Sequence, residues 1–358
     1  MTSPRARATA FCERFGLRTP ILLGPMAGTP QTALSIAVAN AGGMAALGAL
    51  MLTPAQITAW MHDFRARSDG PCQINLWIPD PPPVRDAEAE TAVRGFLGQW
   101  GPAVAENAGD AKLHDFAAQC DATLEARPAA ISSIMGVFPP DVVARAKAAG
   151  IAWFAAATTL SEALQAEAAG ADVIVAQSFE AGGHRGAFDA ANAERQATGL
   201  FALLPRIVDR VRVPVIAAGG IADGRGIAAA LTLGASAVQI GTGFLRTPEA
   251  GIASSWADAI AAAEPEDTWP TRAFSGRLGR SLATDYVRAA ASEDAPRPAA
   301  YPVQRGLTAA MREAAAKSND VSRMQAWAGQ SAWLAPALPA AECIERWWNE
   351  AEALLPSK

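Results

Sequence analysis

His184 lies in a loop whose residue types could transfer a proton and bind an anion. Gln177 ends a short apolar run before it, and Gly182 and Gly183 directly precede it. An imidazole has an unperturbed pKa of about 6.5, so it can exchange a proton near neutral pH. A carboxamide can hydrogen-bond a flat heterocycle, and glycines let backbone N–H groups approach an anion. The pattern predicts a ligand-binding loop with a titratable group, and a purely structural histidine is the alternative.

Two further segments combine glycine with potential hydrogen-bond donors. Gly219 and Gly220 follow the next apolar run, and Gln239-Ile240-Gly241-Thr242 ends the run after that. Without a Cβ, glycines allow main-chain N–H groups to point at phosphate oxygens, and a following helix N-terminus adds partial positive charge. Single glycine pairs are common in tight turns. Here two such segments follow successive apolar runs, which are the last two of the eight candidate strands described below. This arrangement favours a phosphate site, with the Thr242 hydroxyl as an extra hydrogen-bond donor.

Composition and charge narrow the class of protein. The chain has 358 residues, of which 51% are hydrophobic and 18% charged, as expected of a compact enzyme. The formal net charge is −5, and no cluster of lysine and arginine stands out, so neither nucleic acid nor a membrane is an expected partner. The oligomeric state stays open.

The cysteines indicate the compartment. Cys12, Cys72, Cys120 and Cys343 are far apart, and none belongs to a Cys-x-x-Cys pair, so no metal site or disulfide framework is expected. No apolar run reaches the roughly 18 residues needed to span a bilayer. The sequence predicts a soluble, cytoplasmic protein.

Short apolar runs alternate with alanine-rich helical stretches over the first two thirds of the chain. Eight runs are candidate strands: Pro20–Leu23, Gly43–Leu47, Cys72–Ile78, Ala130–Ile134, Ala152–Ala156, Asp172–Ala176, Val213–Ala217 and Ala237–Ile240. Strands that alternate with helices imply a parallel sheet, and eight units favour a closed (β/α)₈ TIM barrel, an α/β fold. Functional groups of such a barrel gather at the carboxyl ends of its strands. Pro25-Met26-Ala27-Gly28 follows the first run, and Asn75 lies in the third.

The pattern changes after Leu245, where prolines divide the chain into shorter pieces. We expect residues 1–245 to form the barrel, completed by a C-terminal helix within 331–358. Residues 246–330 are expected to form a smaller, mainly helical subdomain on the substrate side. A helical stretch is expected at Val321–Trp327. Glu180 and Arg185 could form a solvated charged pair.

Taken together, these motifs resemble those of the nitronate monooxygenases, formerly called 2-nitropropane dioxygenases. The resemblance covers nearly the whole chain, and the Ala-Gly-Gly-His-x-Gly loop at 181–186 with a preceding glutamine is its most specific part. Its C-terminal part includes Phe274-Ser275-Gly276-Arg277, Tyr301-Pro302 and Trp327-Ala328-Gly329-Gln330.

The resemblance implies an FMN-dependent oxidoreductase, a monooxygenase that converts alkyl nitronates and O₂ to a carbonyl compound and nitrite. Propionate 3-nitronate is the expected substrate, and His184 would be the active-site base or a partner of the nitro group. Tyr301, Gly329 and Gln330 would lie on the substrate side. The residues implied to bind the cofactor are Pro25, Met26, Ala27, Asn75, Gln177, Gly182, Gly183, Gly219, Gly220, Gln239, Ile240, Gly241 and Thr242.

Two other functions share parts of this pattern. An FMN-dependent enoyl-acyl-carrier-protein reductase has the same barrel, the Ala-Gly-Gly-His loop and the glycines after strand seven, but it takes hydride from NAD(P)H. A flavin- or phosphometabolite-binding barrel without catalytic activity would not need a titratable group between glycines.

The chain has two tyrosines, Tyr286 and Tyr301, where relatives of the oxygenase often place several aromatic hydroxyls near the substrate.

Overall fold

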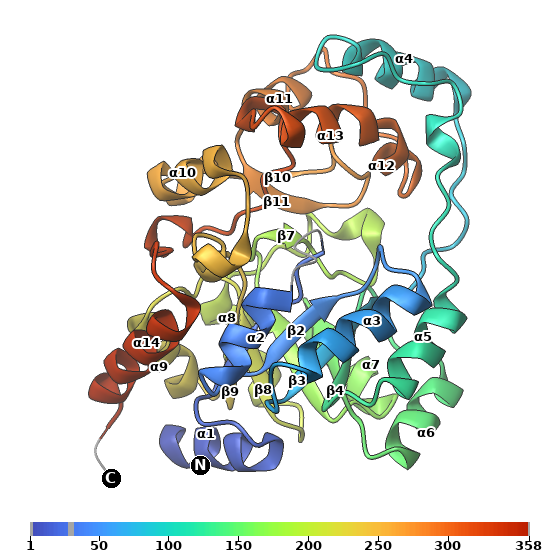
Figure 1. The fold of residues 1–358 in the computed structure, drawn as a ribbon. Coiled ribbons are helices and arrows are strands. Elements are labelled where there is room, and N and C mark those ends of the chain that lie inside the picture. Colours follow the sequence, from blue (N-terminus) through green and yellow to red (C-terminus); the bar gives the residue numbers. More distant parts are fainter. Residues whose placement is uncertain (1–2, 28–31, 357–358) are drawn as a thin grey trace.

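The computed structural model describes residues 3–27 and 32–356. Within these ranges, eight parallel strands form one closed barrel in the order β1-β9-β8-β6-β5-β4-β3-β2 (Figure 1). A bridge between Leu22 and Met44 joins β1 to β2 and closes the barrel. The strands are β1 Ile21–Leu23, β2 Ala45–Gly48, β3 Cys72–Trp77, β4 Ala130–Ile134, β5 Ala152–Ala157, β6 Val173–Gln177, β8 Val215–Ala218 and β9 Ala237–Ile240. The predicted barrel is confirmed.

Helices cover the outside of the barrel. They are α1 Pro4–Phe15, α2 Thr32–Asn40, α3 Pro54–Arg65, α5 Phe116–Glu125, α6 Pro140–Ala148, α7 Leu160–Ala168, α8 Leu200–Val208, α9 Gly224–Thr232 and α14 Ala340–Leu354. Local sequence sets their starts: Thr53 and Gln56 form a capping box on α3, and the Asp223 carboxylate accepts a hydrogen bond from Gly226 N on α9. The barrel strands are largely buried on both faces and their sequences are mostly apolar, although β3 places Gln73 and Asn75 at alternate positions.

The last helix, α14, packs back on the barrel. Trp347 of α14 is buried, and its ring lies 4.9 Å from that of Phe244, edge to face. Gly224 begins α9 directly against α14, where a Cβ would lie 2.3 Å from Glu350 Cβ. This contact attaches the C-terminal helix beside the loops that follow β8 and β9.

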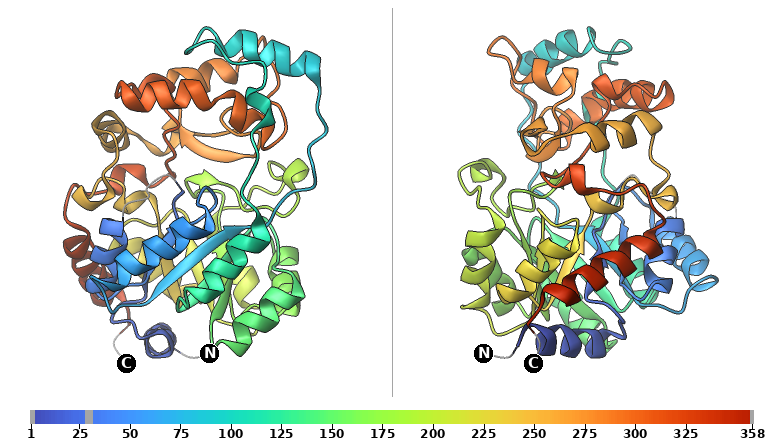
Figure 2. Two further views of the ribbon diagram at one scale, coloured as in Figure 1. Left: turned by 45° about the vertical axis from the view of Figure 1, so that its right-hand side comes forward. Right: turned by 90° about the vertical axis from the view of Figure 1, so that its left-hand side faces the viewer.

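A second unit lies above the carboxyl ends of the barrel strands (Figures 1 and 2). Its helices are α10 Ser254–Ala262, α11 Asp285–Ala290, α12 Val303–Leu307 and α13 Ala309–Lys317. A three-stranded antiparallel sheet connects it to the barrel, with β10 Thr268–Thr271, β11 Gly279–Leu282 and β7 Gly183–His184. The sequence did not indicate this sheet, because β10 contains Pro270, β11 begins at a glycine and β7 has only two residues.

Helix α4 (Ala87–Leu97) packs in the same upper unit, although its sequence lies between β3 and β4. Val93 and Leu97 are buried with Phe274 and Leu307 in one apolar cluster. Figure 2 shows α4 beside the α11–α13 helices, with the chain returning downward to α5. A division of the chain into 1–245 and 246–330 stays a prediction, and the packing adds this early segment to the upper unit.

The segment Val321–Trp327 is not the helix that was expected. It contains one 3₁₀ turn, Val321–Arg323. The chain then extends, and Trp327 forms an antiparallel bridge with Ser281 of β11. None of the described helices is both long and apolar enough to cross a membrane.

Candidate active site

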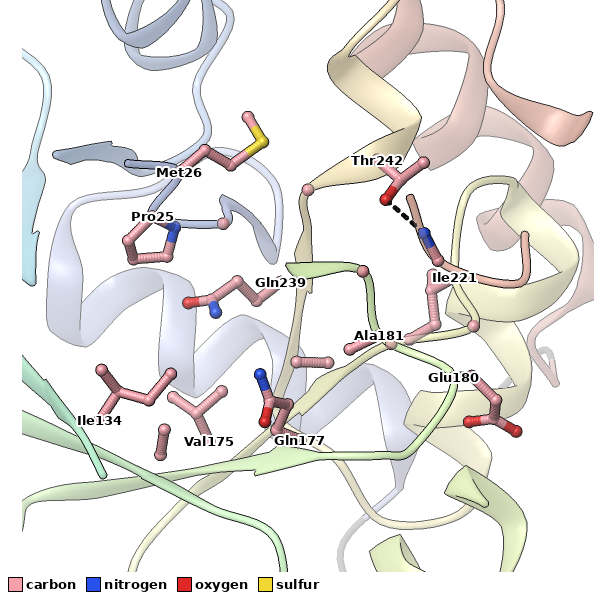
Figure 3. A pocket seen from close by; sticks show the side chains of 18 of the residues that line it. Pro25, Met26, Ile134, Val175, Gln177, Glu180, Ala181, Ile221, Gln239 and Thr242 are labelled. Carbon is pink, nitrogen blue, oxygen red and sulfur yellow. Dashed lines mark hydrogen bonds between the residues drawn. The ribbon is translucent and has the colours of Figure 1, made fainter. Parts of the chain in front are cut away.

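An open cavity of about 870 Å³ lies at the carboxyl ends of the barrel strands. The residues that line it come from the strand ends and the loops after them: Gly24, Pro25, Met26, Gln73, Asn75, Ser132, Ser133, Ile134, Ala156, Val175, Gln177, Glu180, Ala181, Gly182, Ala218, Gly219, Gly220, Ile221, Ala222, Gln239, Gly241, Thr242, Gly329 and Ser331. Figure 3 shows Gln177 and Gln239 pointing toward one another across the site.

Unbonded backbone N–H groups gather on one side of this cavity. The amides of Gly220, Gly241 and Thr242 have no acceptor among the described residues, and all three residues line the cavity. Gly219 and Gly220 have φ values of +97° and +73°, which residues with a Cβ rarely adopt. Free amides on two adjacent glycine loops form a suitable binding site for an oxyanion.

Two other chain segments hold these loops in place. Gly329 N donates to Thr242 Oγ1 at 3.0 Å, and Gln330 N donates to Glu180 O at 2.9 Å. Gly182 lies so close that a Cβ would be 2.5 Å from Gly329 N. Gly329 therefore lines the same cavity as the glycine loops, whereas Gln330 supports it through its backbone.

The glutamine side chains of the site have different partners. Gln177 Nε2 donates to His184 O at 3.1 Å, and Gln177 Oε1 accepts from Gly186 N at 2.7 Å, so this residue braces its own loop. Gln239 Oε1 accepts from Gln73 Nε2 at 3.1 Å. The Gln239 amide nitrogen thus stays available to a ligand.

Polar groups also line the opposite side of the barrel mouth. Asn75 Nδ2 donates to Ser132 Oγ at 3.1 Å, which leaves Asn75 Oδ1 without a described donor. Gln73, Ser132 and Ser133 were not predicted as site residues. Polar side chains inside apolar barrel strands were the available signal, since such groups need partners when buried.

Other predicted residues lie elsewhere. Ala27 and Gly183 are outside the cavity lining, and Ile240 is buried in the barrel core. Gly28 lies outside the described residues. Tyr301 lines a second cavity of about 550 Å³, together with Trp77, Asp80 and Arg277 among others.

His184 lies on β7, within the loop that Gln177 braces. Its ring is between two tryptophans, with centroids 4.8 Å from Trp77 and 4.9 Å from Trp327, and its Nε2 is 2.7 Å from Ser275 Oγ. The imidazole is not among the groups that line the larger cavity. Trp77, however, lines the second cavity, so His184 lies beside the wall of that space.

Burial, followed by the positive charges of Arg305, Arg277 and Arg312 in that order, lowers the pKa of His184 to about 3. Loss of hydration and nearby positive charge both disfavour an imidazolium. The ring is therefore neutral at physiological pH, which makes it a proton acceptor rather than a cationic anchor for an anion.

The family model described as nitronate monooxygenase matches residues 9–350. The chain belongs to the nitronate monooxygenase family. It is thus an enzyme, an oxidoreductase of the nitronate monooxygenase type, in a family of flavoenzymes.

Individual relatives cover nearly the full length. The nitronate monooxygenase of Paraburkholderia phytofirmans is 41% identical over 345 residues, 94% of this chain and 93% of the relative. That of Pseudomonas aeruginosa is 37% identical over 340 residues, 93% and 96% of the two chains. A nitroalkane oxidase structure from Streptomyces ansochromogenes superposes with a TM-score of 0.86 at 35% sequence identity. The match covers 96% of this chain and 98% of that chain. The structure of FabK from Thermotoga maritima superposes with a TM-score of 0.75 at 26% sequence identity, and the match covers 96% of each chain.

In this nitronate monooxygenase family member, Glu180 and Arg185 do not form the solvated pair that the sequence suggested. Arg185 is buried and donates to Gln177 O at 3.1 Å and Gln196 O at 2.8 Å. Glu180 Oε2 accepts from Leu200 N at 2.9 Å, at the start of α8. The arginine supports the backbone of the loop, and the carboxylate is held at a helix N-terminus, where negative charge is stabilised.

The low pKa of His184 predicts a pH-dependent stability. Between about pH 6.5 and pH 3 the unfolded chain binds a proton at this position and the folded chain does not, so the free energy of unfolding falls as pH falls through that window. At pH 5 the loss is about 2 kcal/mol. Urea titrations at pH 7 and pH 5 measure the free energy of unfolding. In His184→Asn this free energy should lack the part of the fall between the two pH values that His184 causes. The exposed His62→Asn serves as control, and equal pH dependence in wild type and His184→Asn would contradict the expectation.

Proposed function

We propose that this enzyme binds FMN in the barrel cavity and oxidises alkyl nitronates with O₂, giving a carbonyl compound and nitrite, with propionate 3-nitronate as substrate. The observation that carries the proposal is the set of unbonded amides of Gly220, Gly241 and Thr242 on one side of a cavity whose other side presents carboxamides. An anion-binding region opposite flat hydrogen-bonding groups suits a molecule that combines a phosphate with a heterocycle.

The residues present fit FMN. Gly220, Gly241 and Thr242 would hold its phosphate, while Asn75 and Gln239 have unused groups for its ring system. When bound, FMN supplies the electron-transfer chemistry, and the protein supplies orientation and electrostatics.

His184 is the group proposed to take the α-proton from a neutral nitroalkane. Ser275 Oγ donates to Arg277 O at 3.3 Å, which leaves it an acceptor for His184 Nε2–H at 2.7 Å. In the proposal, this arrangement puts the proton on Nε2 and leaves the lone pair on Nδ1. Trp77 and Trp327 hold the ring in place, so Nδ1 is the proposed acceptor of the substrate proton.

The test is the absorption spectrum of the purified protein, followed by nitrite release from propionate 3-nitronate in air. A flavin spectrum with nitrite production supports the proposal. The structural likeness to FabK makes the reductase the second candidate. Flavin bleaching by NADPH without O₂, and none by nitronate, would replace the oxygenase with the reductase. A yellow protein inert toward both would support a binding protein without catalytic activity.

A further inference from the structure

Gln73 is a polar residue in the barrel interior that packing alone does not explain. The side chain lies in β3 and is 0% exposed, yet its Oε1 has no hydrogen-bond partner among the described residues. Most buried polar atoms in proteins have a partner, because an unpaired acceptor loses its hydration without compensation. An apolar side chain of the same size would fill this position at lower cost, so the glutamine points to a functional role.

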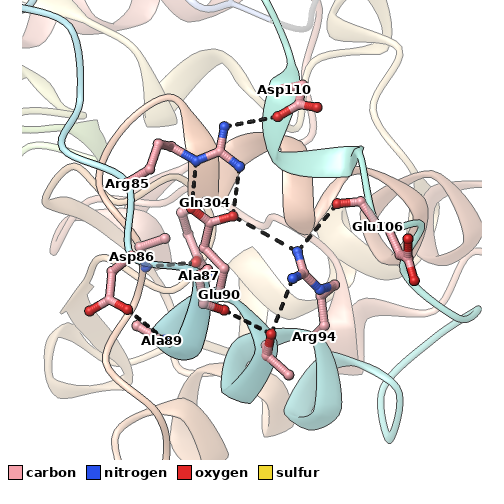
Figure 4. Close-up of polar contacts among 11 residues, drawn as sticks. Arg85, Asp86, Ala87, Ala89, Glu90, Arg94, Glu106, Asp110 and Gln304 are labelled. Atoms are coloured by element: carbon pink, nitrogen blue, oxygen red, sulfur yellow. Dashed lines mark hydrogen bonds and ion pairs between the residues drawn. The ribbon is translucent and has the colours of Figure 1, made fainter.

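A buried polar residue of the upper unit shows the usual arrangement. Glu90 of α4 is buried, and its carboxylate accepts hydrogen bonds from Arg85 Nε at 2.5 Å and Arg85 Nη2 at 2.7 Å (Figure 4). Arg94 lies 3.8 Å from the same carboxylate. Both carboxylate oxygens of Glu90 are therefore paired, whereas the Gln73 carboxamide uses only its nitrogen.

The nitrogen of Gln73 connects two strands that are not neighbours. In the barrel, β1 and β2 lie between β9 and β3, so the 3.1 Å bond from Gln73 Nε2 to Gln239 Oε1 crosses the barrel interior. Gln73 Nε2 also donates to Leu23 O at 3.4 Å. Because a backbone carbonyl can only accept, the Gln73 atom beside Leu23 is the nitrogen, and the Gln239 atom that it meets is the oxygen. The orientation of one carboxamide thus sets that of the other.

This arrangement leaves the Gln239 nitrogen as a hydrogen-bond donor at the cavity. Gln239 is partly exposed and points across the cavity, and its Nε2 has no acceptor among the described residues (Figure 3). Among the described residues that line the cavity there is no lysine, arginine or histidine, and Glu180 is the one charged residue. The end of β9 therefore offers a neutral N–H donor, rather than a cation, to negative charge on a ligand.

We propose that Gln73 is a positioning residue that holds the Gln239 carboxamide with its nitrogen toward the flavin, so that this donor stabilises the reduced ring. The inference rests on the proposed function, since it assigns a role toward FMN in the same cavity. Uptake of two electrons and one proton leaves one negative charge on the pyrimidine part of the flavin ring, and a fixed N–H dipole favours that charge without reorganisation. The pyrimidine part also carries the carbonyl acceptors of the ring system, which match a carboxamide donor.

The experiment measures the two-electron reduction potential of bound FMN by anaerobic dithionite titration with a reference dye. Gln239→Met removes the donor and should lower the equilibrium constant for reduction about tenfold, which corresponds to a fall of about 30 mV for a two-electron couple. Gln73→Met keeps the side-chain length but releases Gln239, and should lower the constant by roughly three- to tenfold. The exposed Gln165→Met on α7 is the matched control and should keep the wild-type potential.

The double variant decides whether Gln73 acts through Gln239. When Gln239→Met is already present, Gln73→Met should change the equilibrium constant by less than about twofold, because no carboxamide is left to orient. The Kd of the apoprotein for oxidised FMN should change by a smaller factor than the equilibrium constant for reduction, since the oxidised ring has no negative charge to stabilise.

An unchanged potential in Gln73→Met, or an equal fall with and without Gln239→Met, would overturn the positioning role and leave FMN binding intact. A wild-type apoprotein that takes up no FMN would overturn the proposed function and this role together. Urea unfolding checks that each variant is folded. If Gln73→Met does not fold, Gln73→Leu takes its place in the same set of variants, with the same expected results.

Discussion

Replacing His184 with asparagine should lower kcat/KM for neutral nitroalkanes by roughly 10²-fold, at the lower end of the usual contribution of a positioned base. The lower end applies because burial and nearby arginines hold the pKa of His184 at about 3, and a base this weak drives proton transfer less than one with a pKa near 7. The corresponding nitronates have already lost the α-proton. They should lose only about tenfold or less, the effect of one hydrogen bond.

The measurement is steady-state nitrite release from nitroethane and from its preformed nitronate, with flavin content checked by absorbance. His62→Asn, an exposed histidine on α3, is the control and should match wild type on both substrates. An equal loss on nitroalkane and nitronate, with flavin still bound, would rule out proton abstraction by His184. Ser275→Ala should also lower kcat/KM more for the nitroalkane than for the nitronate, but by a smaller factor than His184→Asn. The reason is that it removes the hydrogen bond at Nε2 of the His184 ring.

Gly219→Ala should raise the Kd for FMN by roughly 10- to 100-fold, as the loss of hydrogen bonds to a charged phosphate predicts. The residue has φ +97°, and a Cβ would lie 2.5 Å from Ser178 Oγ and 2.8 Å from Ala181 N. A hydroxyl can rotate away, but the amide of Ala181 is backbone. The loop that carries the unbonded amide of Gly220 must therefore move.

Gly150→Ala separates this effect from backbone strain. Gly150 also has a positive φ, +71°, and no atom lies within 4 Å of a Cβ built there. Each variant should lose about 1–2 kcal/mol of stability from the left-handed conformation, but only Gly219→Ala should weaken FMN binding in fluorescence titrations of the apoprotein. Equal FMN affinity in the two variants would exclude the loop after β8 as the phosphate site.

The barrel itself was predictable because its signals are local. Strands such as β6 are buried on both faces and so read as apolar runs, here Val173 to Ala176 before the polar Gln177, and alternation with helices implies parallel pairing. Parallel pairing then brings all the carboxyl ends to one side, which is why the sequence predicts that Gly182, Gly219 and Thr242 lie around one cavity.

The surroundings of His184 could not be derived in this way. Ser275 binds its ring across 91 residues of sequence, and Trp327 lies on a segment that was expected to be helical. The free carboxamide groups of the barrel mouth likewise depend on partners in other strands, as between Gln73 and Gln239.

The sequence by itself determined the fold class, the edge of the barrel where the cavity lies and the glycine loops, because each of these follows from periodicity and backbone freedom over a few residues. Only the tertiary structure decided that His184 is neutral and that its ring lies beside Trp77 and Trp327. Those properties depend on burial and on distances between charges, which arise when α12, β11 and the segment around Trp327 pack above the barrel.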